Sequence, residues 1–102
     1  LMERDALPAI ALTTNTSILT SVANDAAFDQ VFARQVRALV QKGDVVVGIS
    51  TSGNSPNVLN AILAAQDKGA ITLGFTGRSG GKLKERVDIC FCVPSPASTK
   101  IW

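Results

Sequence analysis

The sequence predicts an α/β fold, a three-layer parallel sheet flanked by helices. Short apolar runs rich in Val, Ile and Leu alternate with longer segments whose apolar residues recur at helical spacing. Alternation of strands and helices is typical of a parallel sheet covered by its connecting helices. The 102 residues are 46% hydrophobic and show no internal repeat, which fits one domain with a buried core.

Four apolar runs predict the strands. They cover residues 7–12, 45–49, 71–76 and 88–93. The second run, Val-Val-Val-Gly-Ile, is the clearest, because it is continuous, rich in β-branched residues and too short for a buried helix. A fully buried parallel strand is the natural interpretation of such a run.

The segments between these runs predict helices over residues 18–23, 28–40, 56–68 and 82–86, the first and last being short. Gly43 and Gly69 follow the two longer helices as C-terminal stops. The apolar residues expected to face inward are Phe28, Val31, Phe32, Val36, Leu39 and Val40 in one helix and Val58, Leu59, Ile62 and Leu63 in the other.

Charge and composition exclude several classes of function. Ten basic and eight acidic residues give a net charge of +2, with no block of like charge, so nucleic acid is not an expected partner. No apolar run reaches the length of a membrane span, and no signal peptide is visible, so we expect a cytoplasmic protein. Because the chain has no histidine, a Ser-His-Asp triad and a histidine metal site are excluded within it.

The two cysteines, Cys90 and Cys92, are two residues apart in the last apolar run. On a strand they point to the same face, with a separation poorly suited to a disulfide. The spacing is not Cys-x-x-Cys and supports neither a redox nor a zinc motif. Two small buried hydrophobic side chains are the expected role, and no metal ligands are assigned in this chain.

The segment at residues 50–55, Ser-Thr-Ser-Gly-Asn-Ser, is the strongest candidate for chemistry. It follows the strand at 45–49 and leads into the helix that begins at Pro56, and ligands of open α/β sheets bind at that end of the strands. Ser50, Thr51, Ser52 and Ser55 offer four short hydroxyls to a phosphate.

The backbone around these hydroxyls suits the same ligand. The first helical turn is expected to offer unpaired amides and a partial positive charge. Gly53 permits a tight turn, and Ser55 with Pro56 suits a helix start. An ordinary strand-to-helix turn uses the same residue types, so the residues alone leave phosphate binding and a plain turn both open.

The same segment resembles the phosphate loop of sugar isomerase (SIS) domains. Further similarity, to the sedoheptulose 7-phosphate isomerase (phosphoheptose isomerase) family of these domains, extends over nearly the whole chain in order. It is carried by residues 8–14, Ala23-Asn24-Asp25, residues 31–39, Thr76-Gly77 and residues 80–83.

The resemblance implies an enzyme that converts sedoheptulose 7-phosphate to D-glycero-D-manno-heptose 7-phosphate, for lipopolysaccharide or related surface glycans, through an enediol. It implies that residues 50, 51, 52 and 55 hold the phosphate, that Asn24 and Asp25 line the sugar end, and that Thr76 is a weak candidate. A helix cap is an equal alternative for Asp25, and a solvated turn residue is the alternative for Asn24. Family members are homotetramers with active sites at subunit contacts and often contain zinc.

The chain also departs from the family. Complete members are nearly twice as long, with a further Ser-rich loop, His, Glu and Gln residues that have no counterpart here. Residues 1–102 are therefore expected to be a partial SIS domain, an internal fragment inactive alone, whose catalytic base and zinc ligands lie outside it. The family's flavodoxin-like strand order places a missing first strand centrally, between residues 7–12 and 45–49. We expect its loss to leave open strand edges and exposed apolar faces, so that the chain is marginally stable or associates.

A non-catalytic SIS module is the alternative function. Relatives of this fold sense sugar phosphates in transcription regulators, and another branch binds the bacterial replication initiator. The loop of that branch tends to carry a basic residue where this chain has Ser52, which favours the isomerase.

Overall fold

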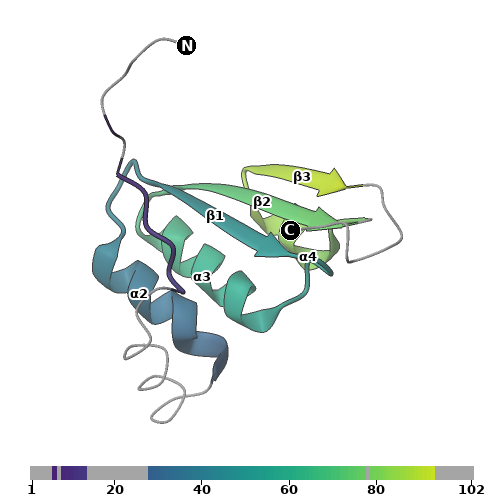
Figure 1. Ribbon diagram of the computed structural model, residues 1–102, viewed down its shortest axis with the longest axis horizontal. Coiled ribbons are helices and arrows are strands. Elements are labelled where there is room, and N and C mark those ends of the chain that lie inside the picture. The colour runs from purple at the N-terminus through teal and green to yellow at the C-terminus, as the bar shows by residue number, and fades with distance from the viewer. Residues whose placement is uncertain (1–5, 7, 14–27, 78, 94–102) are drawn as a thin grey trace.

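The computed structural model describes residues 6, 8–13, 28–77 and 79–93. The elements in chain order are η1 (Phe28–Gln30), α2 (Val31–Leu39), β1 (Val45–Ser50), α3 (Pro56–Asp67), β2 (Ile71–Gly77), α4 (Gly81–Arg86) and β3 (Ile89–Val93). The strands form one parallel sheet in the order β1-β2-β3 (Figure 1). The predicted parallel α/β architecture with flanking helices is confirmed.

The boundaries of α3 follow from local chemistry. Ser55 is the N-cap and Pro56 is the first helical residue, where the missing N–H of proline costs no hydrogen bond. Lys68 closes the helix, and Gly69 follows with φ of +80°, a conformation that glycine adopts without strain. Both predicted signals, proline at the start and glycine after the end, are confirmed.

The core lies where α2 packs on α3, and small residues dominate it. Its buried members are Ala33, Val36, Ala61, Ala64, Ala65 and Ala70, with Leu12, Phe32, Val40 and Val46 partly buried against them. The prediction that Phe28, Leu39 and Leu63 face inward is wrong, since these side chains are 61%, 51% and 40% exposed. The alanines make the close helix contact, and the buried residues of α3 are Ala61, Ile62, Ala64 and Ala65, so Ile62 faces inward as predicted while Leu63 does not.

The described helices lie on one face of the sheet (Figure 1). Glycines in the strands allow the close approach: a Cβ on Gly48 would lie 2.9 Å from Val58 Cγ1, and one on Gly74 would lie 3.2 Å from the Leu83 side chain. The second helical layer of the predicted three-layer fold is not found among the described residues.

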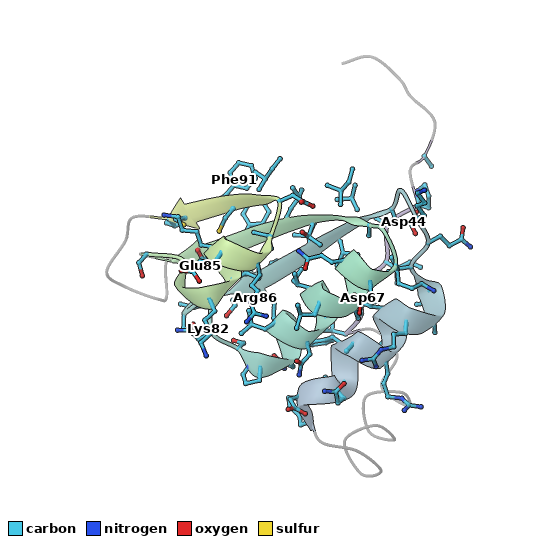
Figure 2. All side chains as sticks on the ribbon, turned by 180° about the vertical axis from the view of Figure 1, so that it is seen from behind. Asp44, Asp67, Lys82, Glu85, Arg86 and Phe91 are labelled. Carbon is cyan, nitrogen blue, oxygen red and sulfur yellow. The ribbon has the colours of Figure 1, made fainter. Side chains whose placement is uncertain are left out.

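The opposite face of the sheet is apolar and uncovered among the described residues. We call it the exposed sheet face; it consists of Val45, Val47, Ile49, Ile71, Phe75, Ile89 and Phe91, which are 38–59% exposed. Phe75 and Phe91 are register partners, and their rings stack with centroids 5.0 Å apart. Figure 2 shows Phe91 on the side of the sheet away from α3 and α4. The expected exposure of an apolar face is thus confirmed.

The strand predicted at residues 7–12 does not form over 8–12, while residue 7 lies outside the described part of the chain. A strand requires a hydrogen-bonded neighbour. By the family strand order that neighbour would be a strand absent from this chain. Instead, Gln35 Nε2 donates to the Leu12 carbonyl at 2.8 Å and holds the segment against α2. The short helix predicted at 18–23 lies outside the described residues.

Candidate functional site

Residues 50–55, which we call the serine loop, connect the C-terminal end of β1 to the N-terminus of α3. β2 ends beside it, with Thr76 in register with Ser50. The turn from β2 into α4 lies at the same edge of the sheet (Figure 1). The carboxyl edge of a parallel sheet is where this fold class binds ligands.

Ser50 and Ser55 converge within this loop. Their hydroxyl oxygens lie 2.7 Å apart. Ser50 is 5% exposed, and its Oγ also accepts the backbone amides of Gly53 at 3.1 Å and of Ser55 at 3.4 Å. The buried Ser50 hydroxyl thus organises the whole turn.

We infer the direction of the hydrogen bond between the two serines from the amides that surround Ser50. A serine oxygen has two acceptor lone pairs and one proton. The amides of Gly53, shared with the Ser50 carbonyl, and of Ser55 both point at Ser50 Oγ, and we therefore assign the donated proton to Ser50 and the acceptor to Ser55. With that assignment the proton of Ser55 is free to donate to another acceptor, and the bond that its oxygen accepts strengthens it as a donor.

Ser52 and Thr51 present the other two predicted hydroxyls. Both side chains are exposed. Ser52 Oγ accepts the Asn54 amide at 3.1 Å, which leaves the Ser52 proton available as a donor. The Thr51 carbonyl accepts the Gly77 amide at 2.9 Å and so fastens the loop to the end of β2.

The expectation that free backbone amides line this loop is only partly met. The amides of Gly53, Asn54 and Ser55 all donate to serine oxygens of the same loop. In the first turn of α3, the Val58 amide donates to Asn57 Oδ1 at 2.8 Å, and the next amide donates to the Ser55 carbonyl. Of the loop and first-turn amides, those of Ser52 and Asn57 keep no internal partner among the described residues, so the outward donors are these two amides together with the hydroxyl groups.

A second loop, which the sequence did not assign to the site, supports the first. Gly53 has φ of +74°, and a Cβ there would lie 1.9 Å from the Gly80 carbonyl oxygen. The Leu83 amide donates to the Gly53 carbonyl at 2.8 Å, and the Lys82 amide donates to Asn54 Oδ1 at 2.9 Å. The paired glycines at 80 and 81, both with positive φ, are the sequence signal that could have located this support.

Thr76, the weak candidate for a sugar contact, is fully buried and faces the cysteines. Its hydroxyl donates to Cys92 Sγ at 3.4 Å and lies 3.8 Å from Cys90 Sγ. The hydrogen bond from Thr76 lowers the pKa of the Cys92 thiol, whereas burial raises the pKa of the Cys90 thiol. The prediction that both cysteines share one face is confirmed, since their sulfurs are 3.8 Å apart.

Asn24 and Asp25 lie outside the described residues, so the predicted sugar-end contacts stay predictions. Within the described ranges, no group of three or more His, Cys, Asp or Glu side chains could hold a metal ion. The same part of the chain contains no helix long and apolar enough to cross a membrane.

A family model described as SIS domain matches residues 1–77, which include β1, the serine loop and β2. The chain belongs to the SIS domain family. Among curated SIS relatives, it is similar to the phosphoheptose isomerase of Roseiflexus sp., with 58% identity over 99 residues, covering 97% of this chain and 50% of the relative. The phosphoheptose isomerase of Geobacter metallireducens is 58% identical over 100 residues, covering 98% of this chain and 53% of the relative. The chain spans about half the length of the curated relatives it matches.

Solved structures of SIS proteins show the same similarity. A phosphoheptose isomerase from Neisseria gonorrhoeae matches with a TM-score of 0.87 and 49% identity, covering 89% of this chain and 52% of that one. One from Francisella tularensis matches with a TM-score of 0.88 and 42% identity, covering 92% of this chain and 51% of that one. The predicted SIS-type fold is therefore confirmed.

Proposed function

We propose that this chain is the phosphate-binding part of a sedoheptulose 7-phosphate isomerase that forms D-glycero-D-manno-heptose 7-phosphate. One observation carries the proposal: the Ser50 and Ser55 hydroxyls converge at 2.7 Å at the carboxyl edge of the sheet, and the amides that point at Ser50 leave Ser55 as the hydroxyl available to a ligand. The identity of more than half of the residues to phosphoheptose isomerases supports the choice of substrate.

In this proposal the loop residues have different roles. Ser52 and Ser55 donate hydroxyl protons to phosphate oxygens, and exposed Thr51 offers a third hydroxyl. Buried Ser50 acts through Ser55 and holds the turn, because its own proton and lone pairs are already used. Charge-assisted donation to phosphate is about twice as strong as donation between neutral groups.

The phosphate anchor would act at a distance from the reacting carbons. Holding the phosphate fixes the sugar chain relative to a general base, and such positioning contributes to the rate without chemistry at the anchor itself. We assign the base to the part of the longer relatives that this chain does not span. Asn24 and Asp25 would line the sugar end.

The assembly and setting are also proposed from the family likeness. We propose a cytoplasmic homotetramer with active sites at subunit contacts, acting in the synthesis of lipopolysaccharide or related surface glycans. Zinc, which the family often contains, has no ligand set at the proposed isomerase site: the chain has no histidine, and its described residues offer no cluster of three metal ligands. We therefore route no step through zinc in this chain.

The test is the steady-state kinetics of the longer protein that contains this chain. Replacing Ser52 and Ser55 together by Ala removes two donors to an anion, each worth about 1.5–3 kcal/mol. We expect KM for sedoheptulose 7-phosphate to rise at least ~10-fold for each hydroxyl. Asp67→Ala, at the opposite end of α3, is the matched control and should leave KM unchanged.

The outcomes separate the candidate functions. An unchanged KM in the double variant would remove the phosphate assignment. Phosphosugar binding without any turnover by the unmodified protein would instead favour the non-catalytic SIS module.

A further inference from the structure

Cys90 and Cys92 take no part in the proposed isomerase site, yet they form an ordered pair of thiols. Both are free and half-buried on the helix-covered side of β3, the edge strand of the described sheet. Their sulfurs lie 3.8 Å apart. Thr76 Oγ1 lies 3.4 Å from Cys92 Sγ and 3.8 Å from Cys90 Sγ, so the buried threonine contacts both sulfurs.

The separation of the sulfurs matches a chelating geometry. With metal–sulfur bonds of about 2.3 Å and a tetrahedral angle, two thiolates on one Zn²⁺-like ion lie ~3.8 Å apart. The observed 3.8 Å already equals that edge. Both thiols could therefore bind one centre without moving the strand.

A disulfide between Cys90 and Cys92 would require a larger change in geometry than chelation of one ion. Two residues of parallel strand span about 6.6 Å. That distance is near the ~6.8 Å upper limit of Cα separations in disulfides, and the sulfurs would also have to close to ~2.05 Å. The pleat of β3 thus favours a bridging atom between the two sulfurs over a direct sulfur–sulfur bond.

We propose that Cys90 and Cys92 form a dithiol site that chelates one thiophilic metal or metalloid centre. Thiolate ligands select soft centres over Mg²⁺ or Ca²⁺. The hydroxyl of Thr76 orients Cys92 by donating to its sulfur. Water or an exogenous ligand completes the coordination of a metal ion, whereas a trivalent arsenical needs only the two sulfurs.

The Cys90–Cys92 pair also lies next to the turn at Gly80 that supports the serine loop. A Cβ on Gly80 would lie 3.0 Å from Cys92 Sγ, and the Gly80 carbonyl packs directly on Gly53. An ion held by the sulfurs would sit next to the turn that positions the serine loop.

Phenylarsine oxide is the probe of choice because its reaction with two thiols is balanced and redox-neutral. Two arsenic–sulfur bonds form, the arsenic–oxygen bond and two S–H bonds break, and the oxygen leaves as water with both protons. Arsenic stays trivalent. Mass spectrometry of the whole chain, followed by mapping of the peptide that contains both cysteines, counts and locates the adducts.

We expect one arsenical per chain that survives excess monothiol and is removed by a dithiol. Cys90→Ser and Cys92→Ser should each abolish the monothiol-resistant adduct. In parallel, each variant should bind Cd²⁺ at least ~10-fold more weakly than the unmodified chain, read from the thiolate-to-metal absorption band.

Two results would overturn the proposal. One is an adduct in the unmodified chain that monothiol removes, which needs no variant to fold. The other is a Cd²⁺ absorption band that either single variant retains at full strength.

Discussion

Gly53→Ala is the sharpest perturbation of the serine loop, because a matched control exists in the same chain. Gly53 and Gly43 both have positive φ, +74° and +90°. A Cβ on Gly43 would meet nothing within 4 Å, whereas one on Gly53 would lie 1.9 Å from Gly80 O and 2.5 Å from Gly80 C. The two substitutions therefore share backbone strain and differ only in a backbone clash.

The expected magnitudes follow from that difference. Alanine in the left-handed region costs about 1–2 kcal/mol at either position. At Gly53 the loop must also move away from Gly80. This movement would weaken or break the hydrogen bonds that the amides of Leu83 and Lys82 donate to the loop. Each such bond contributes about 0.5–1.5 kcal/mol. We expect a loss of about 1–2 kcal/mol in the free energy of unfolding for Gly43→Ala and about 2–5 kcal/mol for Gly53→Ala.

Urea unfolding measures the stability difference, and calorimetric titration with inorganic phosphate measures its effect on the site. Gly43→Ala should keep its affinity for phosphate, while Gly53→Ala should lose most of it even at temperatures where the variant is folded. Equal destabilisation by the two variants would refute the contact between Gly53 and Gly80. Unchanged phosphate affinity in folded Gly53→Ala would refute the link between that contact and the site.

Three further predictions test separate parts of the molecule. Ser50→Ala should lower the free energy of unfolding by about 1–3 kcal/mol, because it removes the hydroxyl that accepts the amides of Gly53 and Ser55 and pairs with the Ser55 hydroxyl, whereas Ser55→Ala should mainly weaken phosphate binding. Urea unfolding and calorimetry tell the two variants apart, and the reverse order would contradict the assigned bond direction. Thr76→Val should raise the pKa of the Cys92 thiol, since the hydrogen bond that lowers it is lost, and the midpoint of the iodoacetamide rate against pH should move upward; an unmoved midpoint would contradict this. Ile49→Thr on the exposed sheet face should reduce self-association of the chain in sedimentation velocity, and a chain that is monomeric without the substitution would count against the reasoning.

The strands show how far the sequence predicts this fold. Residues 45–49 and 8–12 are both apolar runs, and only the first forms a strand. The first has β2 as its hydrogen-bonded neighbour, while residues 8–12 have no partner strand among the described residues. An apolar run in the sequence indicates that the segment tends to adopt an extended backbone. It does not indicate whether a neighbouring strand is present to pair with it. The strand at 71–76 was predictable because both its neighbours are encoded in the same 102 residues.

The position of the serine loop between a strand and a helix was predictable, but its hydrogen bonds were not. Hydroxyl residues after a strand and before Pro56 locate the serine loop from sequence alone. The direction of donation between Ser50 and Ser55 depends on a backbone turn that brings their oxygens to 2.7 Å and aims two amides at one of them. No pattern of residue types contains that information, which is why amides were expected to be free.

The serine loop cannot be understood as a property of β1 and α3 alone. The family match ends at residue 77, whereas the groups that hold the loop from behind, Gly80, Lys82 and Leu83, come after it. Several amides of the serine loop donate to acceptors within the loop. Its hydroxyls can point in a fixed direction only if the loop backbone is held in place. The second strand-to-helix turn supplies that hold through the Gly53–Gly80 contact and two amide bonds. The smallest physical unit of the candidate site therefore runs from Val45 to Leu83. A chain ended at residue 77 would keep every hydroxyl that we propose to bind phosphate, yet it would lose the contacts that hold those hydroxyls in position.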